Sequence, residues 1–258
     1  MNHILFSIEN SVARITFNRP QVFNSMNAPM RREILETLAI CEKDNAVRAV
    51  CITGSGKAFC AGEDLQEVTD PNGPSLTEII STGYNPIVLQ IRNLEKPVVC
   101  AVNGVAAGAG ANIALACDIT VAAASASFTQ AFSKIGLIPD SGGTWTLPRL
   151  VGLQRATALM MLSDKITAQD AAAMGMIWKV FPDETFAEES LRLAETLAAM
   201  PTKGLAYTKQ ALNRTFSNDF AAQLAVEDQL QTAAGQTSDY REGVAAFLEK
   251  RKPLFKGI

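Results

Sequence analysis

Residues 96–124, KPVVCAVNGVAAGAGANIALACDITVAAA, decide the fold class of this chain. They contain a short apolar run that ends near Asn103, a segment rich in glycine and alanine, and a second apolar run after Asp118. Short apolar strands separated by a helix are typical of a βαβ unit, whose parallel strands are covered on both faces. The segment therefore predicts an α/β fold.

The chain ahead of this segment predicts a hairpin and then an amphipathic helix. Residues 4–9 and 12–17 alternate in polarity around an Asn10-Ser11 turn, which is a hairpin signal. Residues 27–45 then carry apolar side chains at helical spacing, at Met30, Ile34, Leu38 and Cys41. Strands and helices are thus expected to alternate from the N-terminus onward.

Beyond Trp145 the pattern becomes almost wholly helical. Thr167 to Asp170 resemble a capping box, which marks the start of a helix. No repeat of fixed period interrupts the series. We expect a β/α core over residues 1–190 and a helical segment over residues 191–258.

Composition excludes several classes of protein. The chain has 258 residues, of which 48% are hydrophobic and 19% charged, so it can bury a sizeable core. A net charge of −3 argues against a nucleic-acid binder that relies on a basic surface. No apolar run approaches the roughly 18 residues that span a bilayer, and no signal-peptide pattern follows the first residue. We expect a cytoplasmic protein with no nucleic-acid or membrane partner.

Cysteine and histidine usage narrows the chemistry. The five cysteines form no CxxC pair, and Cys51 and Cys100 lie in apolar runs that indicate reduced core thiols. His3 is the only histidine and lies in the expected first strand. Mechanisms that need a histidine base, and zinc sites built on histidine, are therefore not expected. We expect no metal, and chemistry that depends on carboxylates, amides and hydroxyls.

The first candidate loop is FCAGEDL, residues 59–65. Gly62 permits a backbone conformation that leaves the N–H of Glu63 pointing outward. An ordinary turn between a strand and a helix explains the loop equally well.

The second candidate loop, around residues 103–112, is more specific. Gly104, Gly108 and Gly110 allow close backbone approach where a helix begins, and the free N–H groups of its first turn favour an anion. A phosphate cradle is the competing interpretation, but the P-loop lysine is missing and the spacing is not GxGxxG. An oxyanion site is favoured.

Asp140 is the candidate acid–base residue. The pattern alone also predicts a helix N-cap at this aspartate, ahead of a helix beginning near Gly142. Its neighbours are nevertheless apolar, and include Phe132, Ile138 and Trp145. Burial among such residues would raise the pKa of the Asp140 carboxyl, which suits a proton shuttle.

The C-terminus concentrates basic residues in an acidic chain. These residues are Lys250, Arg251, Lys252 and Lys256. Cations at the end of a helix commonly complement its dipole at the surface. A contact with the phosphates of a ligand is the functional alternative.

Long segments of the chain resemble the crotonase (enoyl-CoA hydratase/isomerase) superfamily. They are FCAGEDL, AVNGVAAGAGANIALACDI, FSKIGLIPDSGGTWTLPRLVG, ITAQDAAAMGMIWKVFP and DYREGVAAFLEKRKPLF. The resemblance runs nearly end to end, and within the superfamily it is strongest to the 1,2-epoxyphenylacetyl-CoA isomerases of phenylacetate catabolism.

The resemblance implies a spiral of ββα units with a helical C-terminal trimerisation region, usually in a dimer of trimers. It implies an acyl-CoA substrate whose thioester oxygen is held by the main-chain amides of Glu63 and Ala109. Gly108, Asp64 and Leu65 flank these amides and are expected to contact the substrate. No cofactor is implied, because CoA is part of the substrate.

Two departures from the resemblance argue against the addition of water by a two-glutamate mechanism. Hydratases of the superfamily use two glutamates to activate water, and the matching positions here are Asn112 and Phe132. Asparagine cannot act as a base, and Phe132 would keep water out of the pocket. Asn112 is instead expected to orient either the substrate or Asp140, while Phe132 and Trp145 border the acyl group.

The sequence therefore predicts an acyl-CoA isomerase with Asp140 as its single proton shuttle. The favoured reaction converts 1,2-epoxyphenylacetyl-CoA to oxepin-CoA. The alternatives are a Δ3,Δ2-enoyl-CoA isomerase, a weak enoyl-CoA hydratase, and a non-catalytic assembly protein with the same fold. A dehalogenase that uses the matching aspartate resembles this sequence less, because it also needs a histidine base.

Overall fold

The N-terminal hairpin forms as predicted. In the computed structural model, which describes residues 2–258, β1 (Ile4–Glu9) pairs antiparallel with β2 (Val12–Phe17). Asn10 and Ser11 join the two strands with φ values of 49° and 61°. A two-residue hairpin turn needs these left-handed angles, which asparagine tolerates better than most residues.

The larger sheet has six strands in the order β1-β2-β3-β5-β7-β10. From β2 to β10 neighbouring strands are parallel. Every residue of β5 is buried, as expected for a central parallel strand. The additional strands are β3 (Ala49–Gly54), β5 (Val98–Val102), β7 (Ile119–Ala123) and β10 (Lys179–Phe181). β10 corrects the prediction of an almost wholly helical chain beyond Trp145.

A second sheet of four short strands lies beside the first. The resemblance implied ββα units with two strands each, but the residue pattern did not locate these strands. Its order is β4-β6-β8-β9, with the first three strands parallel. β3, β5 and β7 are each followed along the chain by one of these short strands. The chain therefore winds as a spiral in which each turn adds one strand to each sheet. The strands are β4 (Ala58–Cys60), β6 (Val105–Ala107), β8 (Ser127–Thr129) and β9 (Ile166–Thr167).

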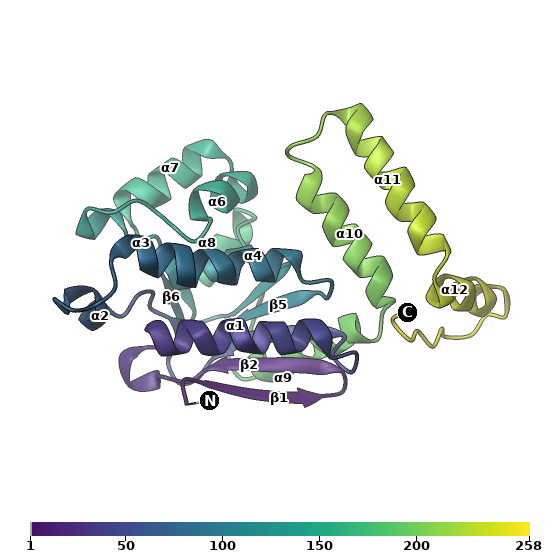
Figure 1. Cartoon of the computed structure of the whole chain (residues 1–258), viewed down its shortest axis with the longest axis horizontal. Coiled ribbons are helices and arrows are strands. Elements are labelled where there is room, and N and C mark those ends of the chain that lie inside the picture. Colours follow the sequence, from purple (N-terminus) through teal and green to yellow (C-terminus); the bar gives the residue numbers. More distant parts are fainter. Residues whose placement is uncertain (1) are drawn as a thin grey trace.

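Helices cover the sheets and fill the connections (Figure 1). In α1 (Ala28–Lys43) the four predicted apolar positions are all buried, and α9 (Phe186–Ala198) packs on β3 and β5. The other helices of the core are α4 (Asn85–Asn93), α5 (Ala109–Ala116), α6 (Gly143–Val151), α7 (Leu153–Leu162) and α8 (Ala168–Ala173). Short turns are η1 (Pro20–Val22), α2 (Leu65–Thr69), α3 (Leu76–Glu78), the π-helix η2 (Ile79–Tyr84) and η3 (Ser133–Ile135).

The C-terminal helices stand beside the core. Figure 1 shows α10 (Thr202–Arg214), α11 (Phe220–Gly235) and α12 (Ser238–Leu248) projecting to one side of the molecule. The expected boundary at residue 190 lies inside α9, one helix ahead of this projection. Within residues 2–258, no helix combines the length and apolarity that a bilayer crossing requires.

A buried ion pair holds α10 against the core. Lys209 of α10 is 8% exposed, and its Nζ lies 2.8 Å from Oδ2 of Asp118 and 2.7 Å from the carbonyl oxygen of Ile91. Burial lowers the pKa of Lys209 and raises that of Asp118, and the attraction between the two charges opposes both shifts. Asp118 also accepts a hydrogen bond from the backbone of Val98 in β5.

We predict that Lys209→Met lowers the free energy of unfolding by about 3–5 kcal/mol, because it leaves a buried carboxylate without its cation. Lys203→Met on the same helix removes an exposed pair with Glu95 and should cost at most about 1 kcal/mol. Urea denaturation of both variants measures the difference. Equal and small losses would show that the buried pair does not anchor α10.

Candidate active site

The segment after β4 presents the main-chain N–H of Glu63. Gly62 takes a φ of 99°, in the region that favours glycine. Met26 donates to the carbonyl of Gly62 at 2.8 Å and accepts from the N–H of Asp64 at 2.9 Å. These two bonds form a parallel bridge around Glu63, so its own N–H points away from Met26. Within residues 2–258 that N–H has no acceptor.

The second candidate donor is the N–H of Ala109, the first residue of α5. Gly108 precedes it with φ 52° and ψ −128°, and gives its own N–H to the carbonyl of Thr129 at 2.9 Å. N–H groups in the first turn of a helix have no partner inside the helix. The N–H of Ala109 is therefore available to a ligand oxygen, as the sequence predicts.

The two loops meet. β4 and β6 pair in parallel, which brings the ends of both strands to one edge. A Cβ atom added to Gly62 would lie 3.6 Å from the backbone nitrogen of Ala109, and one added to Gly110 would lie 2.4 Å from the carbonyl oxygen of Cys60. This approach leaves no room for a side chain at Gly110, and it places the two donor segments side by side.

The turn that carries Asp140 lies against the first turn of α5. The carbonyl oxygen of Asp140 accepts from the side chain of Asn112 at 2.9 Å and from the N–H of Gly143 at 2.8 Å. Asn112 follows Ala109 by three residues, so both lie on one face of α5. The structure thereby brings the Asp140 turn close to the second donor.

Asp140 is not the N-cap of α6. The cap position is Gly142, with φ 75° and no side-chain cap bond, and the helix begins at Gly143. The carboxylate of Asp140 accepts only the hydroxyl of Ser141, at 2.8 Å, among residues 2–258. The capping interpretation is wrong, because the turn through Ser141 (φ 50°) and Gly142 directs the helix start away from this side chain.

The environment of Asp140 makes it a stronger base than an exposed aspartate. Asp140 is half-buried, and burial raises the pKa of its carboxyl while the hydrogen bond from Ser141 opposes the rise. No cation pairs with it among the described residues. A carboxylate of this kind can take up a proton and return it.

Asn112 serves the fold of the Asp140 turn. It is fully buried, and while its amide donates to Asp140 its oxygen accepts from Nε2 of Gln130 at 2.7 Å. A Cβ atom on Gly143 would lie 2.3 Å from the Asn112 amide nitrogen, so the two segments are in tight contact. Asn112 was expected to orient either the substrate or Asp140, and its amide is bonded to the main-chain carbonyl of Asp140. Gln130 was missed, since nothing in its local sequence marks it.

Phe132 lies beside the second donor loop. The side chain is 6% exposed, and its ring lies 3.8 Å from the position of a Cβ atom on Gly108. An apolar ring at this place removes water from the neighbourhood of the Ala109 N–H.

Asp64 is buried and bonded within the protein, whereas Leu65 is exposed. The carboxylate of Asp64 pairs with Arg19 at 2.9 Å and caps α2 through the N–H of Gln66. It is 9% exposed and fully engaged within the protein, so it supports the donor loop. Leu65 is 58% exposed and presents apolar surface at the start of α2.

Trp145 lines a hollow next to the Asp140 turn. Its indole packs edge-on against Phe216, with the guanidinium of Arg149 stacked at 4.1 Å. The hollow has a volume of about 340 Å³ and is also lined by Ser141 and Gly142, which follow Asp140. Trp145 thus shares a hollow with the two residues that follow Asp140.

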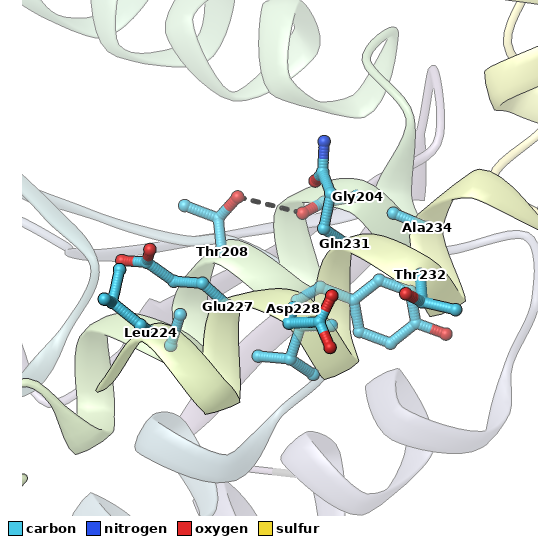
Figure 2. Close-up of a pocket in the computed structure, with 11 residues that line it drawn as sticks. Gly204, Thr208, Leu224, Glu227, Asp228, Gln231, Thr232 and Ala234 are labelled. Atoms are coloured by element: carbon cyan, nitrogen blue, oxygen red, sulfur yellow. Dashed lines mark hydrogen bonds between the residues drawn. The ribbon is translucent and has the colours of Figure 1, made fainter. Parts of the chain in front are cut away.

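A second hollow, larger than the one at Trp145, is lined by no residue of the donor loops. It has a volume of about 660 Å³ and lies between α10 and α11. Figure 2 shows polar side chains at its rim, including Thr208, Glu227 and Gln231. No group there combines a free main-chain donor with a buried carboxylate. Among residues 2–258, no cluster of three or more His, Cys, Asp or Glu side chains could hold a metal ion.

The cysteines are buried, and Arg251 of the basic tail pairs with carboxylates of the protein. All five cysteines are buried and unpaired, as predicted for Cys51 and Cys100. Burial raises the pKa of Cys51 to about 12, so it is not a nucleophile. In the tail, Arg251 is paired with Glu242 and Glu249 on the protein itself.

Comparisons with known proteins bear on the family and the fold. Residues 7–258 match the family described as enoyl-CoA hydratase/isomerase. The chain is 48% identical over its whole length to the 1,2-epoxyphenylacetyl-CoA isomerase of Escherichia coli strain K12, and covers 99% of it. It is 34% identical to the 2,3-dehydroadipyl-CoA hydratase of that organism, with all of both chains covered. The enoyl-CoA hydratase structure from Bacillus anthracis matches with a TM-score of 0.95 at 33% identity, covering 99% of this chain and 100% of that one. The expected crotonase-like spiral with a helical C-terminal region is confirmed.

We predict that Asp140→Asn raises the free energy of unfolding at neutral pH. The pKa of Asp140 is raised in the folded protein, so its ionised form destabilises the fold above that pKa. The difference should shrink as pH falls through the raised pKa of the folded protein, and it should vanish below the ordinary aspartate value, where folded and unfolded chains are both protonated. Urea unfolding across this pH range measures it. A wild-type protein that is the more stable at neutral pH would show that Asp140 is a structural group.

Proposed function

Because the chain belongs to the enoyl-CoA hydratase/isomerase family, we propose that it is an acyl-CoA isomerase with Asp140 as its proton shuttle. The main-chain amides of Glu63 and Ala109 hold the thioester oxygen of the substrate. The observation that carries this proposal is the meeting of two unpartnered N–H donors near the turn of a half-buried, unpaired carboxylate.

The two amides lower the cost of an enolate. When a proton leaves the carbon next to the thioester, negative charge moves onto the thioester oxygen, where fixed N–H dipoles need no reorganisation. Losing one such donor typically raises the barrier by about 2.7–4 kcal/mol. Asp140 receives the proton and returns it to another carbon. For the epoxide substrate this is also a carbon, because the oxygen of an oxepin is bonded to two ring carbons and carries no proton. The proposed reaction uses no redox cofactor, because substrate and product are isomers and no electrons are gained or lost. It uses no metal, because the two amides stabilise the charge, and CoA enters as part of the substrate.

Water addition is disfavoured by the residues around Asp140. Asn112 has both ends of its amide engaged, with Gln130 and Asp140. Phe132 is buried and apolar beside the donor loop. Neither can activate water, so one carboxylate remains to move one proton.

The favoured substrate is 1,2-epoxyphenylacetyl-CoA, with oxepin-CoA as product. The support is the 48% identity over the whole chain to a protein of that activity. A Δ3,Δ2-enoyl-CoA isomerase is the second candidate, because a single carboxylate and two amides meet every requirement of a double-bond shift. Assaying both classes of thioester with one preparation separates them.

We also propose that the protein works as a homotrimer or a dimer of trimers, assembled through α10–α12. These helices leave large apolar side chains on the surface of the single chain, and such patches mark contact sites. Phe220 is 80% exposed and Phe247 is 83% exposed.

We predict that Asp140→Asn lowers isomerase kcat by about 100-fold or more, as expected for loss of an acid–base group. Acyl-CoA affinity and the mass of the assembly should persist, because asparagine keeps the shape of the side chain. Steady-state kinetics, calorimetry and light scattering measure the three properties. The control is Asp183→Asn, an exposed carboxylate that also accepts from a serine hydroxyl, that of Ser125. Near-normal turnover of Asp140→Asn would remove Asp140 from the mechanism.

We predict that crotonyl-CoA is hydrated far more slowly than either isomerase substrate is converted. The reason is that Asn112 and Phe132 occupy the places where a hydratase needs carboxylates. The loss of absorbance of the conjugated thioester gives the rate. Hydration as fast as isomerisation would mean that another group activates water.

A further inference from the structure

The side chain of Glu63 lies in a buried cluster that the proposed reaction does not use. We call Arg31, Glu63, Glu67 and Tyr84 the Arg31 cluster. Nη1 of Arg31 lies 2.7 Å from both carboxylate oxygens of Glu63, and its Nη2 lies 2.9 Å from Oε2 of Glu67. The hydroxyl of Tyr84 donates to Glu63 at 2.5 Å.

The cluster joins three elements to the donor segment. Arg31 belongs to α1, Glu67 to α2 and Tyr84 to the end of η2. Glu67 also accepts the N–H of Ala28 at 3.1 Å, at the start of α1. Glu63, which carries the first donor, is therefore bonded to residues 32 and 21 positions away in the sequence. Arg31 is bonded in turn to Glu67, 36 positions away.

The space around Arg31 fits its side chain closely. Arg31 is 4% exposed and Tyr84 is 1% exposed, with the guanidinium carbon 5.5 Å from the centre of the Tyr84 ring. A Cβ atom on Gly83 would lie 2.6 Å from Cδ of Arg31. Any larger residue at Gly83 would displace the cation.

Arg31 is the cation that pairs with both carboxylates of the cluster. Glu63 and Glu67 share this one cation. Burial raises the pKa of Glu63 to about 7; Tyr84 and Arg31 oppose the rise, and the hydrogen bond with Glu67 adds to it. Burial alone would lower the pKa of Arg31, but its pairing with Glu63 raises it. Above its pKa, Glu63 therefore depends on Arg31 to offset its charge.

Glu63 also supplies the first main-chain donor through its own N–H. An unpaired carboxylate on Glu63 would repel the negative charge that develops on the thioester oxygen at its own N–H. A loose side chain would also let the peptide between Gly62 and Glu63 turn.

We propose that Arg31 and Tyr84 are positioning residues for the oxyanion site, which hold the Glu63 peptide in its donating orientation and offset the carboxylate charge beside the developing enolate. This inference rests on the proposed function, because it takes the Glu63 N–H as a donor to the thioester.

The first test is a rescue. Loss of Arg31 raises the pKa of Glu63 further, so the assay is run across a pH series that extends above that raised pKa. At the alkaline end, where Glu63 is ionised, Arg31→Met should lower isomerase kcat by roughly tenfold or more, short of the about 100-fold that follows loss of a whole donor. Adding Glu63→Ala removes the unpaired carboxylate but keeps the N–H, so the double variant should recover most of the lost rate. If Arg31 only stabilised the fold, the double variant would be as slow as the single one, or slower. That result would overturn the inference.

The second test reads the donor directly, without turnover. The probe is phenylacetyl-CoA labelled with carbon-13 at the thioester carbonyl, and the readout is its infrared stretching frequency when bound. The wild-type protein should lower the frequency, Arg31→Met should return it toward the value in water, and Arg31→Met with Glu63→Ala should lower it again. Tyr84→Phe is the milder variant and should give a smaller change in the same direction, even if Arg31→Met fails to fold.

The control and the outcomes separate the two proposals. Lys209→Met removes another buried cation, from a pair that does not contact the donor segment, and should leave the bound frequency unchanged. A wild-type frequency equal to that in water would contradict the proposed function. A lowered wild-type frequency that Arg31→Met and Tyr84→Phe both leave unchanged would contradict only the role of the Arg31 cluster.

Discussion

The close approach of two glycine loops is the constraint on which the candidate site depends. Gly110 packs against the carbonyl of Cys60 with no space for a Cβ atom, and Gly62 lies beside Ala109. The parallel pairing of β4 with β6 imposes this contact, because it ends both strands at one edge. Two N–H groups from segments 46 residues apart in sequence thereby meet without any side chain between them. The donors are rigid because the sheet that carries them is rigid.

The proposed acid–base group, Asp140, has a different requirement. Asp140 must be held firmly without its carboxylate being paired, and the structure achieves this through the main chain. Asn112 and Gly143 both bond to the Asp140 carbonyl, whereas the carboxylate meets only the Ser141 hydroxyl. Burial then raises its pKa, which costs stability where the group is ionised. Positive φ values at Ser141 and Gly142 are a second cost of the same turn.

Local patterns predicted the elements whose physics is local. The Asn10-Ser11 turn and the apolar stripe of α1 were predicted and are present. The strands of the second sheet are only two or three residues long, too short for polarity to alternate, and so they were missed. The pattern could not show whether Asp140 caps a helix. The structure decides this, because Gly142, with its positive φ, takes the cap position of α6. Arg31 and Gln130 were missed because each acts on a partner at least 18 residues away.

The central claim is that Glu63, Ala109 and Asp140 surround one acyl thioester. The most direct measurement is a crystal structure of Asp140→Asn with a bound substrate acyl-CoA. The account predicts the thioester oxygen within hydrogen-bond distance of both main-chain nitrogens, and the side chain at position 140 facing the acyl carbons. A thioester bound elsewhere, such as in the hollow between α10 and α11, with the two N–H groups facing water, would contradict it.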